Sequence, residues 1–134
     1  MDLNSFKECL TKQRDGSPIY VGDSVFYCRR WGTPESQKFV RDLRRSLFGP
    51  FHKAQDSDDS WLCAEWLCGY GVTRWENVTD GEKVIDFSES TARNIFLNPE
   101  YQLSLNSILI AAVMNFENYL YDEAEGDFEA LKKK

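Results

Sequence analysis

The fold is decided by residues 60–70, which read SWLCAEWLCGY. Drawn as a helix, this stretch carries apolar side chains on nearly every face, which is typical of a helix that other elements surround. Asp59 or Ser60 can cap its first turn, because their side-chain oxygens accept hydrogen bonds from the free amides there. Gly69 and Gly71 then end the helix. The sequence therefore predicts a Trp-rich helix at the centre of the core.

Earlier in the chain, residues 19–28 are typical of a β-hairpin. Two apolar runs flank Gly22-Asp23, and such a pair suits a two-residue turn with positive φ. This turn would place Ile19 opposite Phe26. Because an isolated hairpin is only marginally stable in water, we expect it to pack on helices or to pair with a neighbouring chain.

Residues 33–48 predict a helix between the hairpin and the central helix. Thr33 can cap it, and Pro34 suits the first turn, where a missing amide proton costs nothing. Four apolar residues at helical spacing are expected to form its buried stripe: Phe39, Val40, Leu43 and Leu47. Its solvent-exposed face is expected to be basic and carries Lys38, Arg41, Arg44 and Arg45.

The remaining chain predicts further helices and one turn-rich connector. Residues 5–11 predict a short helix with Phe6, Cys9 and Leu10 facing inward, and residues 88–97 predict another. The last and longest helix is expected to begin at Asn98-Pro99 and to continue through Tyr119. Residues 75–87, with an Asp-Gly turn, predict either a second small hairpin or an ordered loop.

These elements predict a mainly helical α+β fold: four or five helices around the central Trp-rich helix, with an N-terminal β-hairpin. We expect residues 1–121 to form one globular domain and residues 122–134 an acidic tail. The chain has 134 residues, 42% of them hydrophobic, which fits a single core. Its longest apolar run, Ile108–Met114, is far shorter than the roughly 20 residues of a membrane helix.

Charge is distributed unevenly along the chain. Residues 1–53 hold ten basic and six acidic side chains, whereas residues 54–134 hold six basic and sixteen acidic ones. A basic N-terminal part and an acidic C-terminal part favour head-to-tail self-association or a charged protein partner. Ordinary solvated faces with uneven charge explain the same pattern equally well.

Residues for catalysis or metal binding are scarce. His52 is the only histidine, and we expect it to be a surface residue rather than a general base. Cys63 and Cys68 are five positions apart, so on one helix they diverge by roughly 140° and cannot share an ion. The first residues lack a signal-peptide pattern, so we expect a reducing cytoplasm and free thiols. The sequence predicts no enzyme activity, no metal site and no cofactor.

Two stretches resemble a known family. In the first, residues 25–35, a strand ends in arginine and leads into a Thr-capped helix. The second begins at Leu67 and carries Trp75, then an Asp-Gly turn, a Phe-Ser helix start at Phe87 and a final helix. Together they cover most of residues 25–121. This pattern is similar to that of the tail assembly chaperones of long-tailed bacteriophages.

The resemblance implies a non-enzymatic protein of the host cytoplasm. Such a chaperone binds the long, helical tape measure protein, recruits tail tube subunits around it and self-associates. A chaperone of this kind needs an apolar surface bordered by charge. The candidate partner-binding residues are the basic ones Lys38, Arg41, Arg44 and Arg45, with Phe128 and Leu131 of the acidic tail. The basic helix could receive that tail from a neighbouring copy.

Two other functions remain open on the sequence. One is a head-to-tail connector or completion protein of a tailed phage, which would form rings in the virion. The other is a small nucleic-acid-binding adaptor that uses the Arg-rich helix, although the acidic balance of the chain disfavours nucleic acid as a partner. No contact with a membrane is expected.

Overall fold

The computed structural model describes residues 1–53, 55 and 58–121, and these form the mainly helical α+β fold that the sequence predicts. The strands are β1 (Ser17–Val21), β2 (Ser24–Cys28), β3 (Val72–Glu76), β4 (Thr79–Asp80) and β5 (Lys83–Val84). The α-helices are α1 (Leu10–Asp15), α2 (Pro34–Phe48), α3 (Asp58–Trp66), α4 (Glu89–Phe96), α5 (Pro99–Gln102) and α6 (Leu105–Met114). Two short 3-10 helices, η1 (Leu3–Phe6) and η3 (Phe116–Tyr119), and a π-helical turn, η2 (Leu67–Gly71), complete the described elements.

The predicted β-hairpin is confirmed in position and register. Strands β1 and β2 are antiparallel, Ile19 pairs with Phe26, and Gly22 has the positive φ of 59° that the two-residue turn requires. The support for the hairpin comes from β3, which pairs with the other edge of β2. The sequence interpretation placed Trp75 and Glu76 in a connector and assigned residues 72–74 to no element, so the third strand was missed. The connector that follows does contain a hairpin, β4 and β5, with Gly81 at its turn.

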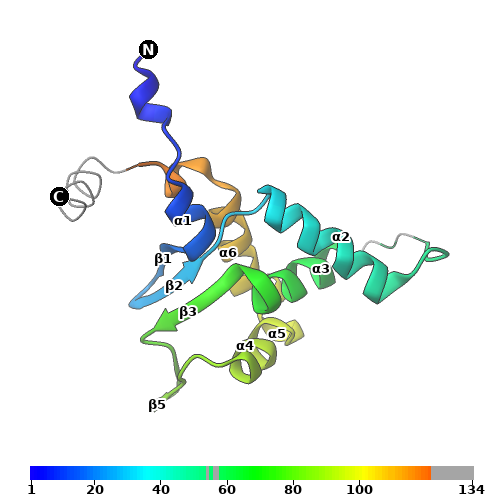
Figure 1. The fold of residues 1–134 in the computed structure, drawn as a ribbon. Helices are drawn as coiled ribbons and strands as arrows, with labels where there is room; N and C mark the ends of the chain where they lie inside the picture. The colour runs from blue at the N-terminus through cyan, green and yellow to red at the C-terminus, as the bar shows by residue number, and fades with distance from the viewer. Residues whose placement is uncertain (54, 56–57, 122–134) are drawn as a thin grey trace.

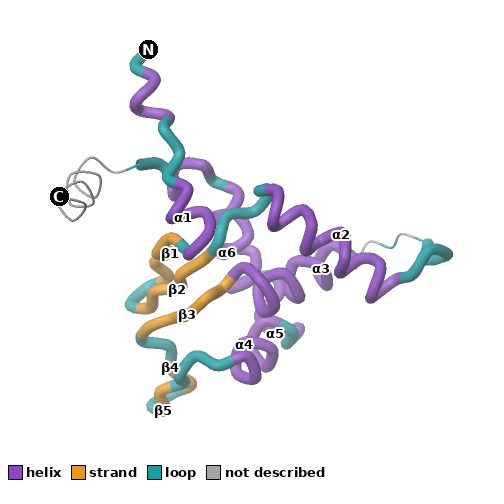
Figure 2. The backbone as a smooth tube through the Cα atoms, in the orientation of Figure 1, coloured by secondary structure: helices purple, strands orange, loops and turns teal. Residues whose placement is uncertain are grey.

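The core lies between one face of the sheet and the central helical segments (Figures 1 and 2). Trp66, at the end of α3, is fully buried, as are Phe96 of α4 and Leu109 and Val113 of α6. From the sheet, Phe26 and its neighbours cover the same core. The predicted central helix is thus confirmed at its C-terminal half, where it turns into η2. Trp61, at its other end, is exposed.

Helices α2 and α3 extend side by side away from the sheet (Figure 1). Because α2 packs along α3 rather than inside the core, its apolar stripe is only half-buried. The predicted stripe of Phe39, Val40, Leu43 and Leu47 does form the inner face of α2, and Phe39 and Val40 pack against the core, but its residues are half-buried rather than buried. Ser36 is the one α2 residue that is fully buried.

The prediction of one long final helix is also wrong, because three elements, α5, α6 and η3, occupy its span. Ser104 has a non-helical backbone and separates α5 from α6. At Asn115 the backbone is extended, and its side chain accepts from the amide of Glu117, so η3 starts afresh there. The Tyr119 hydroxyl donates to the carbonyl of Cys28 at 3.0 Å, which holds η3 against the sheet.

The first predicted helix is displaced along the chain. Instead of one helix over residues 5–11, η1 and α1 lie on either side of Cys9. Cys9 is buried, and its amide donates to the carbonyl of Tyr119 at 2.8 Å. Phe6 and Leu10, which were expected to face inward, are exposed. Among the described residues, no helix is both long enough and apolar enough to cross a membrane.

Candidate protein-binding site on helix α2

Helix α2 begins with a cap that fixes its direction. The hydroxyl of Thr33 accepts a hydrogen bond from the amide of Ser36 at 3.2 Å, and Pro34 occupies the first turn. Both features are visible in the sequence. The Thr33 side chain satisfies an amide that has no partner within the helix, and Pro34 has no amide proton to satisfy. The helix ends at Phe48, before Gly49 with a φ of 67°.

A buried hydroxyl ties the base of α2 to the core. The Ser36 side chain accepts from the indole nitrogen of Trp66 at 3.0 Å and from the amide of Gly32 at 3.3 Å. Ser36 is 1% exposed and Trp66 is fully buried, so water cannot replace either partner. The first turn of α2 is therefore held rigidly while the rest of the helix extends away.

Trp31 lies beside this anchor. Its ring is 4.9 Å from that of Trp66 between centroids, and its amide donates to the carbonyl of Val113 on α6 at 3.1 Å. The indole is only half-buried. A rigidly held aromatic surface is thus presented next to α2.

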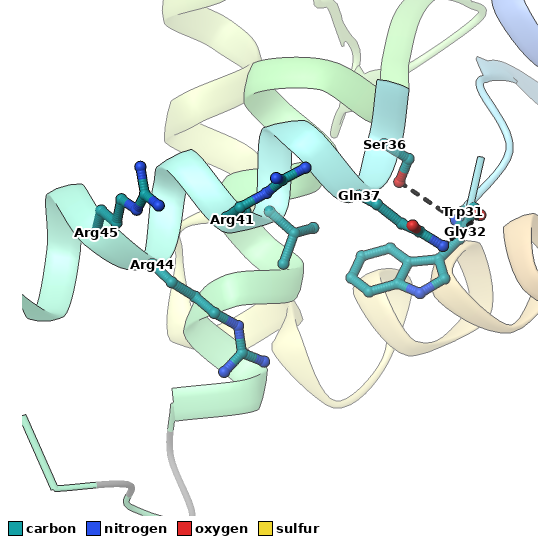
Figure 3. Close-up of a pocket in the computed structure, with 8 residues that line it drawn as sticks. Trp31, Gly32, Ser36, Gln37, Arg41, Arg44 and Arg45 are labelled. Atoms are coloured by element: carbon teal, nitrogen blue, oxygen red, sulfur yellow. Dashed lines mark hydrogen bonds between the residues drawn. The ribbon is translucent and has the colours of Figure 1, made fainter. Parts of the chain in front are cut away.

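Trp31 and α2 enclose a surface hollow of about 400 Å³. Its lining consists of Trp31, Gly32, Ser36, Gln37, Val40, Arg41, Arg44 and Arg45. Figure 3 shows the Trp31 ring and the Arg44 side chain along the same edge of α2, with Arg41 between them along the helix. Trp31 and Val40 contribute apolar surface to this lining, which we call the floor, and Arg41, Arg44 and Arg45 contribute the cationic side chains, which we call the rim. We call this site the α2 hollow.

The rim of the α2 hollow is positively charged. Within the described part of the chain, Arg41 and Arg45 have no carboxylate within 4.0 Å. Arg44 is close enough to Asp58 to help lower the pKa of that carboxyl group. Among the residues that the structure describes, no ion pair occupies the guanidinium groups of Arg41 and Arg45, and a guanidinium group is a strong partner for carboxylates.

A second hollow adjoins the first and shares Arg44 and Arg45 with it. It lies at the end of α2, where the His52 ring stacks on Phe48 at 4.4 Å and its Nε2 lies 2.9 Å from Asp58. The amide of Gln55, followed by the His52 hydrogen bond, lowers the pKa of Asp58 from its usual value. This pair links the ends of α2 and α3, and His52 is a surface residue as expected.

The cysteines are poorly suited to nucleophilic chemistry. All four are free thiols, and Cys9, Cys28 and Cys68 are buried. Burial raises the pKa of Cys28 to about 12 and, with the nearby Glu65 carboxylate, that of Cys68 to about 11. Their reactive thiolate forms are therefore minor at neutral pH. In the described ranges, no histidine, cysteine and carboxylate groups gather into a metal-binding cluster.

The structure brings together three of the candidate partner-binding residues and separates others. Arg41, Arg44 and Arg45 share the rim of the α2 hollow, whereas Lys38 is exposed on α2 without lining it. Phe128 and Leu131 lie outside the described residues. The sequence interpretation missed Trp31. This residue follows Arg29 and Arg30 and comes just before the capped start of α2, so its position was a local signal for an aromatic side chain beside the helix start.

Comparison with known proteins does not extend this description. No protein-family model, curated protein or solved structure matches the chain.

Proposed function

We propose that this protein is a non-enzymatic tail assembly chaperone of a long-tailed bacteriophage, working in the host cytoplasm. Its α2 hollow would bind an acidic, amphipathic helix of the tape measure protein. The resemblance to such chaperones, which covers most of residues 25–121, supports the assignment to phage tail assembly. The α2 hollow supports the choice of ligand chemistry.

The observation that carries the proposal is the pairing of an apolar floor with a cationic rim. An amphipathic helix binds a groove by laying its apolar face on the floor, and burial of that face provides most of the affinity. Charges at the rim select partner and orientation, because carboxylates must meet the guanidinium groups of Arg41 and Arg45. The half-buried Trp31 and Val40 provide the floor.

In this proposal the bound helix belongs to a protein that aggregates when its apolar faces are exposed. Covering such a face until tail tube subunits assemble around it requires binding without chemical change. The high pKa values of Cys28 and Cys68 fit this role, because thiols kept protonated serve packing rather than catalysis.

The test is an affinity measurement between this protein and the purified tape measure protein of the same phage. We expect Arg41→Glu with Arg45→Glu to weaken binding by at least about tenfold, since two attractive rim contacts become repulsive. The control is Lys83→Glu, a single charge reversal at an exposed residue of β5, with an expected affinity close to that of the wild type. Wild-type affinity in the double variant, or no wild-type binding, would refute the proposal.

Two further measurements separate the alternatives: nucleic-acid affinity as a function of salt, and the presence of the protein in purified virions. A nucleic-acid adaptor would bind DNA or RNA through these arginines with an affinity that falls steeply with added salt. A head-to-tail connector would remain in purified virions, whereas a chaperone leaves the finished tail. Either result in place of tape measure binding would assign the chain to that alternative.

A further inference from the structure

The two hollows beside α2 lie on one face of this helix. To the α2 hollow, the helix contributes the residue pairs 36–37, 40–41 and 44–45. To the second hollow it contributes the pair 44–45, followed by the pair 48–49. These pairs recur every four residues, the spacing that places side chains above one another on a helix. The hollows therefore follow each other along a single row, which we call the α2 row, from the first turn of α2 to its C-cap.

The α2 row is longer than the α2 hollow. Ser36 and Gly49 are thirteen positions apart, which corresponds to about 20 Å at the rise of an α-helix. The α2 hollow alone ends at Arg45 and covers about 14 Å of this length. A partner helix that covers the whole row has about 13 residues, or nearly four turns.

An aromatic side chain lies at each end of the α2 row. Trp31 lines the end beside the first turn of α2. At the other end, Phe48 lines the second hollow and stacks on the His52 ring with 4.4 Å between the ring centres. Trp31 and Phe48 are both half-buried. A partner helix that reaches both aromatics therefore needs apolar residues at both ends of its buried face.

The charge changes sign along the α2 row. The three arginines of the rim make its middle positive, whereas Asp58 and Asp59 line the far end. Asp58 already lies 2.9 Å from the Nε2 atom of His52. Asp59 is exposed and forms no ion pair with any residue that the structure describes. A carboxylate of a partner would be attracted at the middle of the row and repelled beside Asp59.

We propose that the α2 row binds a helix of about four turns that carries carboxylates in its middle turns and lysine or arginine in the turn beside Asp59. The apolar face of that helix covers Trp31 at one end and Phe48 at the other. This inference rests on the proposed function, because it specifies which kind of tape measure segment the α2 hollow would hold. A uniformly acidic helix matches only the part of the row at the rim.

The first test compares two synthetic peptides that are cross-linked between successive turns, so that each is helical when free. The long peptide has about 14 residues in the proposed order, and the short peptide lacks the turn with the lysines and the apolar residue before it. Both are made in each chain direction, and the tighter binder of each pair is used. We expect fluorescence anisotropy to show at least about tenfold tighter binding of the long peptide, because only this peptide reaches Phe48 and Asp59. Equal affinities would overturn the proposal.

The second test reverses the charge at the far end of the row. Asp59→Lys should weaken binding of the long peptide by about threefold to tenfold, because one attractive contact at an exposed site becomes repulsive. Binding of the short peptide should not change, which also verifies that the α2 hollow is folded. The matched control is Glu82→Lys, the same reversal at an exposed residue of the turn between β4 and β5. Equal effects of the two reversals on the long peptide would contradict the proposed charge order.

A charge exchange guards against an indirect effect of Asp59→Lys. In a third peptide, glutamates replace the lysines of the long peptide. This peptide should bind the wild type more weakly than the long peptide does, and it should bind the Asp59→Lys variant more tightly than it binds the wild type. The same order of peptide affinities in both proteins would refute the contact with Asp59.

The tape measure protein distinguishes failure of this inference from failure of the proposed function. If Arg41→Glu with Arg45→Glu abolishes tape measure binding but the long and short peptides bind the wild type equally, only this inference fails. If the peptides behave as expected but the tape measure protein does not bind the wild type, the proposed function fails and the charge order of the α2 row stands.

Discussion

At the scale of single residues, Ser36 connects helix α2 to the core. Its hydroxyl is the acceptor for the buried indole of Trp66 and for the amide of Gly32. We expect Ser36→Ala to lower the free energy of unfolding by about 1–3 kcal/mol, the usual cost of leaving a buried donor without a partner. Urea denaturation measures this loss. Ser46→Ala, the same change at an exposed position of α2, is the control, and equal midpoints for the two variants would contradict this role.

Asp58 makes the stability of the α2–α3 connection depend on pH. The amide of Gln55 and the ring of His52 stabilise its charged form, so its pKa is lower in the folded than in the unfolded protein. This stabilisation is fully present above the pKa of Asp58 in the unfolded protein, about 3.9. It is lost as the pH falls through the lower pKa of Asp58 in the folded protein. We expect Asp58→Asn to flatten the fall of unfolding free energy below about pH 4. Urea midpoints measured across this range provide the comparison, and an unchanged slope would exclude the effect.

At the scale of elements, the turn η2 depends on close packing that only glycine permits. A Cβ atom at Gly71 would overlap the ring of the buried Trp66, whereas one at Gly69 would lie 2.8 Å from the ring of Phe39. Phe39 is half-buried on the extending α2 and can move, but Trp66 cannot. We therefore expect Gly71→Ala to cost about 1–3 kcal/mol of stability and Gly69→Ala less. Thermal unfolding of both variants tests the order, and the reverse order would contradict this packing.

Elements whose signals are local were predictable. The hairpin follows from Gly22-Asp23 and its flanking apolar runs, and α2 follows from Thr33-Pro34 at one end and Gly49 at the other. The division of the final helix was not predicted: Asn115 offers a local cap for the amide of Glu117, but the Tyr119 hydroxyl also bonds to the carbonyl of Cys28, far away in sequence. No local pattern marks that contact.

The same distinction applies to the candidate site. The basic face of α2 is visible in the sequence, since helical spacing alone groups its arginines. The floor is not, because Val40 was expected to be buried and becomes half-exposed only through the way α2 packs on α3. Burial along an amphipathic helix depends on its neighbours, which the helix's own residues do not specify.

At the scale of the whole molecule, the central claim is that α2 carries the surface that binds the tape measure protein. The base of α2 is fixed at Ser36, and Phe39 and Val40 pack against the core, while the opposite face of the helix is exposed over most of its length. That arrangement suits a protein whose task is to cover a partner's apolar helix.

Photo-crosslinking to the tape measure protein tests this claim most directly. Gln37→p-benzoylphenylalanine places the reactive group at the α2 hollow, and Tyr20→p-benzoylphenylalanine places it on an exposed position of β1. Mass spectrometry identifies the products. We predict crosslinks from position 37 to acidic amphipathic segments of the tape measure protein and none from position 20. Crosslinks from position 20 alone, or from neither position, would contradict the account.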